Sequence, residues 1–577
     1  MLVKAAVIVG YLAVVTAVGL LARRRSSVGA EDFFLANRSL GPVLLLLTMA
    51  ATNFSAFTVL GFAGMGYRVG WAYYPIMAFG TGFMALSFLF LGVPIRAAAQ
   101  RLGAVSPAEL IGLRFKSPAL RIAFLVVMVV FTLPYLAIQP MGAGYALERL
   151  LGIPYQFGAV LVTAVVVGYV LLGGLRGVVW TDALQGFLML GALVVIFVGV
   201  AGALGGFATA NRLVYARHFR LFVRPGGDGM LVPKIWFSYM LLWLLCDPLF
   251  PQLFQRFMAA KDDRSLRVTA LLYPLVCGGL FFLPIGIGVM ARRILPGLEG
   301  AATDAVLVMA ADAVLPGWLA ALAIAAGLAG LMSTMDSQLL TLGSMVSRDL
   351  LRRDRPVRRL WPERLAVIGL AVAGLALALR PVGTILEIAT ETFTGLAVLF
   401  PLLVAAVYWP RANPWAGLAS IVTGEALVVL YHFKLLPAFG FLPAIPAVAA
   451  SALVLVGGSL LWPRRDLEAF ARVSRAGLAW GGVFGLLFLL SLDFWNWRQS
   501  MPLWANLPGW LWHSFGLILA LFFAVALHLR TRGRSAAEFF IRPSRRDLFR
   551  KLRHVGFKRY FYGGAYHPEP KDDEPSE

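Results

Sequence analysis

The sequence predicts an all-α, polytopic membrane protein, and three observations lead to this fold class. Of its 577 residues, 60% are hydrophobic and only 14% are charged, whereas soluble domains contain roughly 45–50% apolar and about 25% charged residues. The apolar residues form long runs, such as 160–172 and 188–204, and a run of about 20 lets a helix cross a hydrocarbon core about 30 Å thick. Arg and Lys lie mainly between these runs. We therefore do not expect a water-soluble enzyme.

We expect the first predicted helix, at residues 3–21, to be retained and not to act as a signal peptide. Its basic cluster, Arg23 to Arg25, follows the apolar run, whereas a signal peptide carries its positive charge before that run. Hydropathy predicts about fifteen spans in total. They lie near residues 3–21, 41–66, 71–95, 120–147, 154–173, 180–204, 232–258, 266–291, 316–346, 361–379, 383–408, 414–433, 440–462, 476–494 and 509–529.

The positive charges predict the orientation of the chain. The formal net charge is +22, and the bias of Lys and Arg toward cytoplasmic loops accounts for this excess better than nucleic-acid binding. Nucleic acid is therefore not an expected partner. We expect a multi-pass protein of the cell membrane with its N-terminus outside and its C-terminus in the cytoplasm. The segments predicted inside are rich in Arg and comprise 96–121, 256–267, 348–364, 464–475 and the tail from residue 530.

Two basic segments suggest further partners. Segment 208–228 contains four Arg residues although it is predicted to be external, so it is either long enough to escape the charge rule or binds an anionic partner. The tail at 530–577 combines basic and aromatic residues, and we expect it to bind anionic membrane lipid.

Few groups in the sequence suggest catalysis. No nucleophile–base set, metal-binding cluster or phosphate-binding loop stands out, so we do not expect an enzyme. Cys246 and Cys277 both fall in apolar segments and provide neither a disulfide framework nor a metal-ligand cluster.

Polar residues inside the predicted spans carry the functional information, because such side chains are costly at bilayer depth and usually face a protein interior or a water-filled path. The second span contains hydroxyl and amide side chains from Thr48 to Thr58, followed by Gly61, Gly64 and Gly66. This pattern is typical of a helix broken near the bilayer centre, whose freed carbonyls can coordinate a cation. The alternative interpretation is that small residues allow close helix packing.

The ninth span has a polar face. Ser333, Thr334 and Ser337 are spaced three and four residues apart and so share one side of a helix. Sodium is a hard cation that should prefer oxygen ligands, by analogy with calcium and magnesium, and hydroxyls with backbone carbonyls would supply them. Asp336 lies in the same span. The alternative interpretation is a structural hydrogen-bond network.

Three other spans also contain polar residues. Asp247 precedes Pro248, and Gln252 lies nearby. Proline removes a backbone donor and breaks a helix, so we expect the seventh span to be interrupted like the second. Gln139, in the fourth span, either lines a path or pairs with a neighbouring helix. Asp182, at the start of the sixth span, either belongs to a site or caps the helix through its dipole.

The two interrupted spans, the second and the seventh, stand five spans apart. This is the layout of a five-plus-five inverted-repeat transporter, whose binding site lies near the bilayer midplane between the repeats.

Six segments, taken in order, resemble the solute:sodium symporter family. They cover roughly residues 31–424, and the members that look closest carry pantothenate, monocarboxylates or proline. The segments are EDFFLANRSLGP at 31–42, SPAEL at 106–110 with RF at 114–115, GGLRGVVWTDALQ at 173–185, QR and AAK within 255–261, MSTMDSQLL at 332–340, and WPRAN at 409–413.

The resemblance implies a ten-helix, LeuT-like core at residues 41–433. An N-terminal extra helix and cytoplasmic loop would occupy 1–40, additional transmembrane helices 434–529, and a basic cytoplasmic tail 530–577. It also implies sodium as the coupling ion. The main site would use backbone carbonyls and two hydroxyls, from Ala51, Phe54, Gly330, Ser333 and Thr334. A possible second sodium would be held by Asp182, Asp336 and Ser337.

The function implied by the resemblance is sodium-coupled import of a small organic solute by alternating access. The solute would be an amino acid, a monocarboxylate or a vitamin-like molecule. Two alternatives are a proton-coupled symporter, with Asp182, Asp247 or Asp336 as the proton carrier, and a transporter-like membrane sensor. Solute contacts are expected from Asn53, Ser55, Phe57, Gln139, Asp247 and Gln252.

Overall fold

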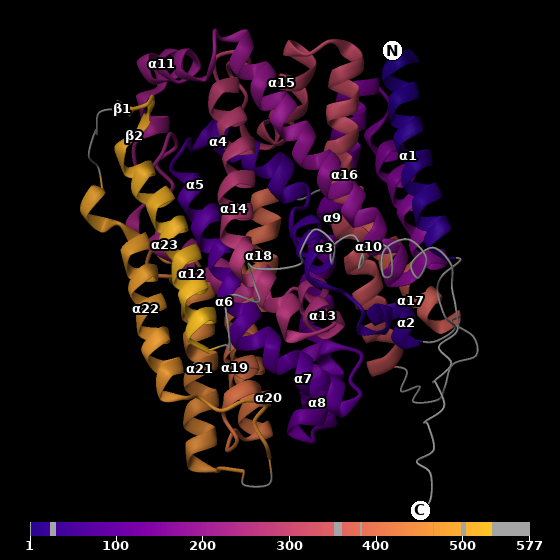
Figure 1. The fold of residues 1–577 in the computed structure, drawn as a ribbon, viewed down its shortest axis with the longest axis vertical. Coiled ribbons are helices and arrows are strands. Elements are labelled where there is room, and N and C mark those ends of the chain that lie inside the picture. The colour runs from indigo at the N-terminus through magenta and orange to yellow at the C-terminus, as the bar shows by residue number, and fades with distance from the viewer. Residues whose placement is uncertain are drawn as a thin grey trace, which may run out of the picture. The chain divides into compact units, whose positions relative to one another are not determined.

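The fold is helical throughout the described part of the chain, apart from one short hairpin (Figure 1). The computed structural model describes residues 2–23, 30–350, 361–380, 383–464, 467–497 and 503–532. The chain divides into two units, Met1–Val525 and Ala526–Glu577, and the architecture below is that of the first. The predicted lipid-binding tail at 530–577 lies, after residue 532, outside the described residues.

The elements up to residue 259 are these, with short 3-10 and π segments labelled η: α1 (Leu2–Arg23), α2 (Ala30–Leu35), η1 (Ala36–Arg38), α3 (Pro42–Asn53), η2 (Phe57–Gly61), α4 (Phe62–Arg68), α5 (Tyr73–Pro75), η3 (Ile76–Thr81), η4 (Gly82–Met84), α6 (Ala85–Ser87), η5 (Phe88–Gly92), α7 (Val93–Leu102), α8 (Pro107–Phe115), α9 (Pro118–Leu151), α10 (Tyr155–Ala203), α11 (Phe207–His218), η6 (Phe219–Phe222), α12 (Pro233–Cys246), η7 (Asp247–Leu249) and α13 (Pro251–Ala259).

The remaining elements are α14 (Asp263–Ala291), η8 (Gly300–Ala305), α15 (Val306–Val314), α16 (Gly317–Met345), η9 (Val346–Leu350), α17 (Trp361–Ala378), α18 (Ile385–Val398), α19 (Phe400–Tyr408), α20 (Pro414–His432), α21 (Ala444–Leu461), α22 (Arg475–Leu492), η10 (Phe494–Asn496), β1 (Leu503–Trp504), β2 (Leu507–Pro508) and α23 (Gly509–Arg532). The strands β1 and β2 form an antiparallel hairpin between α22 and α23.

The number of membrane spans in the structure agrees with the number predicted from the sequence. Among the described residues, twelve helices are long and apolar enough to cross a membrane, and two bent helix pairs bring the number to fourteen. One of the twelve, α10, has 49 residues, and at about 1.5 Å per residue it is too long to be a single span. It contains a non-helical residue, Gly174. Dividing α10 there gives the fifteenth span, so the prediction of an all-α polytopic protein is confirmed.

The break in α10 is shorter than the gap between the predicted spans at 154–173 and 180–204. Only Gly174 departs from helical geometry, with φ 55° and ψ −159°, a combination that is essentially restricted to glycine. A Cβ atom at this position would lie 2.7 Å from the Phe33 ring. The helix resumes at once, so Asp182 lies two turns beyond the break and not in the first turn. The helix-cap interpretation of Asp182 is therefore wrong.

Both predicted helix interruptions are present. The pair of helical segments at Pro42–Asn53 and Phe57–Arg68 is bent by 63°, and the pair at Pro233–Leu249 and Pro251–Ala259 by 52°. In the second pair, Pro251 follows the extended residue Phe250 and has no N–H to donate. Each break leaves backbone groups of a helix end without partners in their own helix.

Two glycines bring α4 and α14 into close contact. A Cβ atom at Gly66 would lie 2.2 Å from the Ile285 carbonyl oxygen, and one at Gly288 would lie 2.0 Å from that of Ala63. Such approaches between backbones are typical of small residues at membrane helix interfaces.

We expect Gly288→Ala to destabilise the protein, because the added methyl group forces α14 away from α4. Overpacking of this kind costs about 1–3 kcal/mol or more, which should appear as a lower midpoint of thermal unfolding in detergent. Gly279→Ala, on the same helix and with no heavy atom within 4 Å of the new Cβ, is the matched control. Equal midpoints for the two variants would contradict the expectation.

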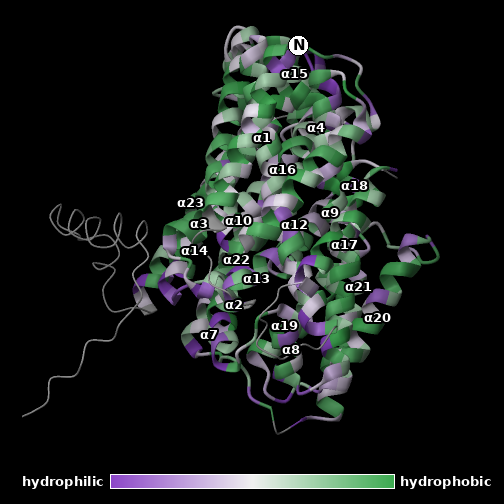
Figure 2. Ribbon diagram, turned by 90° about the vertical axis from the view of Figure 1, so that its right-hand side faces the viewer, coloured by the Kyte–Doolittle hydropathy of each residue, from purple (hydrophilic) through white to green (hydrophobic). Residues whose placement is uncertain are grey.

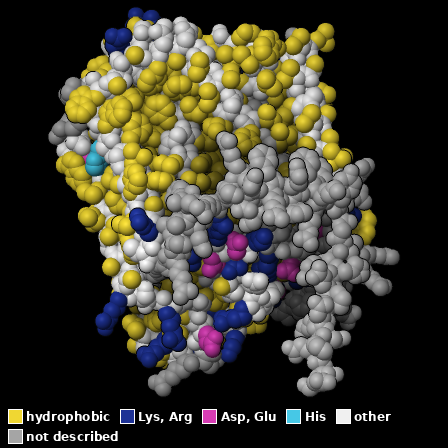
Figure 3. Space-filling view, in the orientation of Figure 1, with side chains coloured by type: hydrophobic (Ala, Val, Ile, Leu, Met, Phe, Trp, Pro, Cys, Tyr) yellow, Lys and Arg dark blue, Asp and Glu magenta, His cyan; other side chains and the backbone are white. Residues whose placement is uncertain are grey.

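The outer surface has the character expected of a membrane protein. Hydrophobic residues predominate along the helices in Figure 2, and in Figure 3 they cover much of the visible face, with Lys and Arg gathering toward its lower end. Figure 1 shows the N-terminus, α11 and α15 at one end, and α7 and α8 at the opposite end. Large exposed apolar side chains include those of Val126, Val130, Phe187 and Val198.

Candidate ion and solute sites

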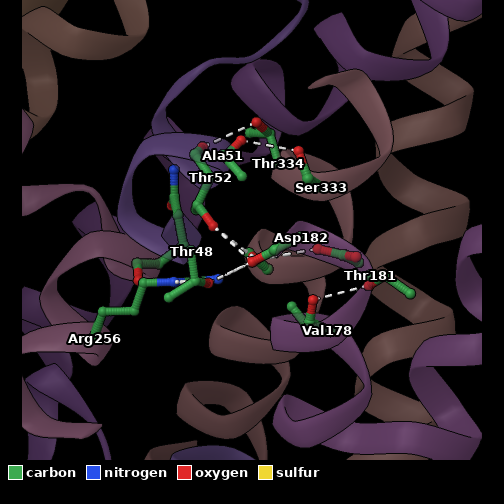
Figure 4. A network of polar contacts seen from close by, with 12 residues as sticks. Thr48, Ala51, Thr52, Val178, Thr181, Asp182, Arg256, Ser333 and Thr334 are labelled. Carbon is green, nitrogen blue, oxygen red and sulfur yellow. Dashed lines mark hydrogen bonds and ion pairs between the residues drawn. The ribbon is translucent and has the colours of Figure 1, made fainter. Parts of the chain in front are cut away.

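The polar face of α16 lies against the end of α3. The Ser333 hydroxyl donates to the carbonyl oxygen of Ala51 at 2.9 Å, and the Thr334 hydroxyl donates to that of Thr52 at 2.9 Å, as Figure 4 shows. Both hydroxyls also reach the Gly330 carbonyl oxygen, at 3.1 and 3.2 Å. These contacts join the first broken helix to the span that the sequence marks as polar.

The break in α3 makes its last carbonyl groups available. The helix ends at Asn53, and the N–H of Phe54 still bonds to Ala50, but the next carbonyls have no following turn to bond with. The Phe54 carbonyl oxygen would lie 2.9 Å from a Cβ at Gly330, so it too is close to α16. The five residues predicted for the main sodium site therefore lie together.

The chemistry of this oxygen set fits a small monovalent cation. Its members are three backbone carbonyls and two hydroxyls, all neutral, and both hydroxyl-bearing residues are at most 1% exposed. Hard cations take oxygen ligands. Because this ligand set has no carboxylate, it supplies no negative charge to balance a divalent ion, and it therefore suits an ion with a single positive charge.

Glycine at position 330 permits the close approach of α3 to α16. A Cβ there would lie 2.8 Å from Met189 Sδ as well as 2.9 Å from the Phe54 carbonyl. We expect Gly330→Ala to raise the sodium concentration for half-maximal transport roughly tenfold, because overpacking separates the two oxygen-bearing segments. Gly327→Ala, whose nearest new contact is 3.9 Å away, should leave this value unchanged. Sodium titration of transport in proteoliposomes measures it.

A second polar cluster is centred on Asp182. Its Oδ2 atom accepts hydrogen bonds from Thr48 at 2.5 Å, Thr52 at 3.1 Å and the Arg256 guanidinium at 2.8 Å. Asp182 and Arg256 have fully buried side chains. Three helices thus meet at one buried ion pair, which Figure 4 shows just beside the Ser333 and Thr334 contacts.

The residues predicted for a second sodium belong to this cluster. The Ser337 hydroxyl donates to Asp336 Oδ1 at 3.1 Å and accepts from Arg256 at 2.7 Å. The other oxygen of Asp336 accepts from the Tyr169 hydroxyl at 2.7 Å. The structure brings Asp182, Asp336 and Ser337 near one another, and it adds Arg256, which sequence reasoning misses and whose guanidinium contacts Asp182 and Ser337.

Two of the predicted solute residues hold the break in α3 in place. The Gln139 Oε1 atom accepts from the N–H of Ala56 at 3.1 Å, and its Nε2 donates to the Tyr135 carbonyl. The Ser55 hydroxyl accepts from the N–H of Phe57. These groups compensate for backbone bonds that the break removes.

The other predicted solute residues have fewer partners within the protein. Asn53 donates to the Tyr273 hydroxyl at 2.7 Å. Neither polar side-chain atom of Gln252 has a hydrogen-bond partner, and Asp247 Oδ2 has none either. The ring of Phe57 lies 5.4 Å from that of Trp243, so aromatic side chains join the two broken helices.

Comparison with known proteins places these features in a family. The model of the sodium:solute symporter family matches residues 33–424. The chain is 29% identical to a sodium/pantothenate symporter of Escherichia coli (strain K12) over 462 residues, which cover 78% of this chain and 95% of that protein. It is 27% identical to a high-affinity proline transporter of Bacillus subtilis (strain 168), with 77% and 95% covered.

The solved structures agree on the fold. A sodium-coupled sialic acid symporter, in a substrate-bound outward-open state, superimposes with a TM-score of 0.66 at 19% identity, covering 80% of this chain and 99% of that one. A nucleobase-cation-symport-1 family transporter with bound bromovinylhydantoin gives a TM-score of 0.54 at 14% identity, with 74% and 94% covered. The predicted five-plus-five, LeuT-like architecture is confirmed.

Proposed function

Because this chain belongs to the sodium:solute symporter family and is a sodium-coupled symporter of a small solute, we propose that its sodium binds between α3 and α16. The ligands are the carbonyl oxygens of Ala51, Phe54 and Gly330 and the hydroxyls of Ser333 and Thr334. The observation that carries the proposal is that the Ser333 hydroxyl contacts the Ala51 carbonyl and the Thr334 hydroxyl contacts the adjacent Thr52 carbonyl, both at the freed end of α3. A bound sodium ion would accept lone pairs from all five oxygens.

This placement explains how sodium would favour solute binding. The end of α3 leads directly into the break that carries Asn53, Ser55 and Phe57, so an ion that fixes α3 against α16 also fixes the solute-contacting segment. Two ligands that stabilise the same arrangement raise each other's affinity by the same factor. Sodium entering down its gradient would therefore carry the solute inward by alternating access.

A second sodium remains a proposal for Asp182, Asp336 and Ser337. The Arg256 guanidinium pairs with Asp182, so one negative charge is left uncompensated if Asp336 is ionised as well, and a second sodium would balance it. A proton on Asp336 would do the same. The sodium-to-solute stoichiometry, measured from the reversal potential in proteoliposomes, distinguishes a second sodium ion from a proton on Asp336.

For the solute we propose a small organic molecule such as an amino acid, a monocarboxylate or a vitamin-like compound, moved without chemical change. The named relatives carry pantothenate and proline, which supports this range. We also propose that the N-terminus lies outside and the C-terminal end in the cytoplasm. The placement of the Arg-rich α7–α8 region opposite the N-terminus (Figure 1) supports this orientation.

Uptake into proteoliposomes tests the proposed coupling. Purified protein is reconstituted, and uptake of labelled amino acids, monocarboxylates and vitamins is compared under an inward sodium gradient and an equal potassium gradient. We expect accumulation with sodium alone. Equal accumulation under a pH gradient without sodium would favour proton coupling instead, and binding without accumulation would favour a sensor.

A further inference from the structure

Asp247 is a buried acid at the break between α12 and α13. The residue is 2% exposed. Among the described residues, its hydrogen-bonding partner is the Cys246 thiol, 3.8 Å from Oδ1, while Oδ2 has no partner. An ionised carboxylate buried without a counter-charge is costly, and intramembrane acids are normally either paired or functional.

The nearest basic residue of the broken helix is already paired. Arg256, on α13, forms its ion pair with Asp182 at 2.8 Å and donates to Ser337 at 2.7 Å and to the Gln252 carbonyl at 3.0 Å. The described part of the chain therefore provides no ion-pair partner for Asp247. If Asp247 is ionised at this place, its counter-charge has to come from a ligand.

Aromatic rings surround the same helix break. Trp243, one turn before Asp247 on α12, has its ring 5.4 Å from that of Phe57 and 5.2 Å from that of Phe393. Phe250, just after η7, lies 4.7 Å from Phe393 and 5.4 Å from Tyr135. Ring faces attract organic cations, and the attraction grows where water is excluded.

Asp247 also lies near the first broken helix. Tyr135 on α9 and Tyr273 on α14 lie within electrostatic range of its carboxyl group. Tyr273 accepts the hydrogen bond from Asn53 at 2.7 Å, and Tyr135 interacts with the side chain of Ser55. The acid and the proposed solute-contacting residues of α3 thus share the same two tyrosines.

Two further side chains at this break lack partners. Gln252 is completely buried, yet neither its Nε2 nor its Oε1 atom is hydrogen-bonded, and the Trp243 Nε1 atom is unpaired as well. Buried polar groups are hydrogen-bonded in the great majority of cases. Three residues with unpaired polar atoms at one break point to a polar ligand at this place.

We infer that the transported solute carries a positively charged ammonium group, which the Asp247 carboxylate binds beside the rings of Trp243 and Phe57. The inference rests on the proposed function, because it names the class of solute for the same transport site. The carboxylate neutralises the ammonium, and the Gln252 amide and Trp243 N–H bind the polar remainder of the solute. An anionic solute without an amine would instead bring a second negative charge beside Asp247.

Matched pairs of probes test this inference on the unmodified protein. In proteoliposomes with an inward sodium gradient, uptake of L-proline is compared with that of cyclopentanecarboxylate, which has the same ring without the amine. Uptake of choline is compared with that of 3,3-dimethylbutan-1-ol, in which carbon replaces the charged nitrogen. Lactate and pantothenate complete the set as amine-free carboxylates. We expect sodium to drive uptake of at least one ammonium probe, at least about 30-fold better than its partner.

Asp247→Asn then tests the role of the acid. It keeps the side-chain shape and removes the charge, so transport of the ammonium probe should fall at least about 30-fold, while the sodium-induced rise in thermal stability persists. Glu425→Gln is the matched control, because Glu425 on α20 is another acid whose two oxygens have no hydrogen-bond partner. Glu425→Gln should leave the ratio of uptake between the ammonium probe and its amine-free partner unchanged.

The outcomes separate the inference from the proposed function. Sodium-driven uptake confined to amine-free probes, or ammonium uptake that survives Asp247→Asn, overturns the inference and leaves sodium symport intact. If no probe of either class responds to the sodium gradient, both the proposed function and the inference fail.

Discussion

Replacing Ser333 and Thr334 together with alanine is expected to abolish sodium-driven uptake at physiological sodium. Two of the five proposed sodium ligands are lost, and the carbonyls of Ala51 and Thr52 lose the hydroxyls that now bond to them. Each contact to a charged partner is worth about 1.5–3 kcal/mol. The sodium concentration for half-maximal uptake should therefore rise at least about 100-fold, as measured in proteoliposomes.

Ser344→Ala is the control for this double variant. Ser344 lies on the same helix and is fully buried, but its hydroxyl donates only to the Thr341 carbonyl of its own helix at 2.6 Å. Its replacement should leave the sodium dependence of uptake unchanged. Undiminished uptake by the Ser333→Ala/Thr334→Ala protein would rule out the assignment of the sodium site.

The second large effect, a loss of thermal stability, is expected from Arg256→Gln. This change leaves the Asp182 carboxylate buried without its cationic partner, which typically costs about 3–5 kcal/mol. The midpoint of thermal unfolding in detergent should fall, and high sodium should restore part of the loss if a metal ion can replace the guanidinium between Asp182 and Ser337. Adding Asp182→Asn removes the stranded charge, so the double variant should be more stable than Arg256→Gln alone.

The comparison variant is Arg267→Gln. Arg267 lies 4.0 Å from Asp263, and the two side chains are 45% and 38% exposed, so this surface pair contributes less than about 1 kcal/mol. A similar loss of stability in Arg267→Gln and Arg256→Gln, or a double variant no more stable than Arg256→Gln, would show that the buried pair has no special role.

The fold could be predicted well from the sequence because a membrane helix is recognisable from a local stretch of residues. Each span is a run of apolar residues, and the two broken helices are marked by glycines or prolines within such runs. The oxygen set between α3 and α16 was also predictable, since Ser333 and Thr334 are adjacent and the resemblance to a family supplied their partners. No local pattern gives the distance between α3 and α16, which only the folded chain determines.

The role of Arg256 shows what sequence reasoning missed. The residue stands at the end of an apolar run, where an arginine ordinarily marks the cytoplasmic boundary, so the sequence predicts a charge that sets only the topology. Its partner Asp182 is 74 residues away, and the pairing depends on how α10 and α13 pack. The aromatic group around Asp247 was missed for the same reason, because Phe57, Trp243 and Phe393 come from three separate spans.

The break at Gly174 has a practical consequence for experiments that follow motion. Two consecutive spans are joined by a single residue, so there is no loop there into which a protease site, an epitope or a reporter cysteine could be placed without disturbing both. Because one residue links the two spans, we expect a displacement of the first to be passed to the second. A spectroscopic probe on the exposed side of the first half of α10 should therefore report rearrangements around Asp182 in the second.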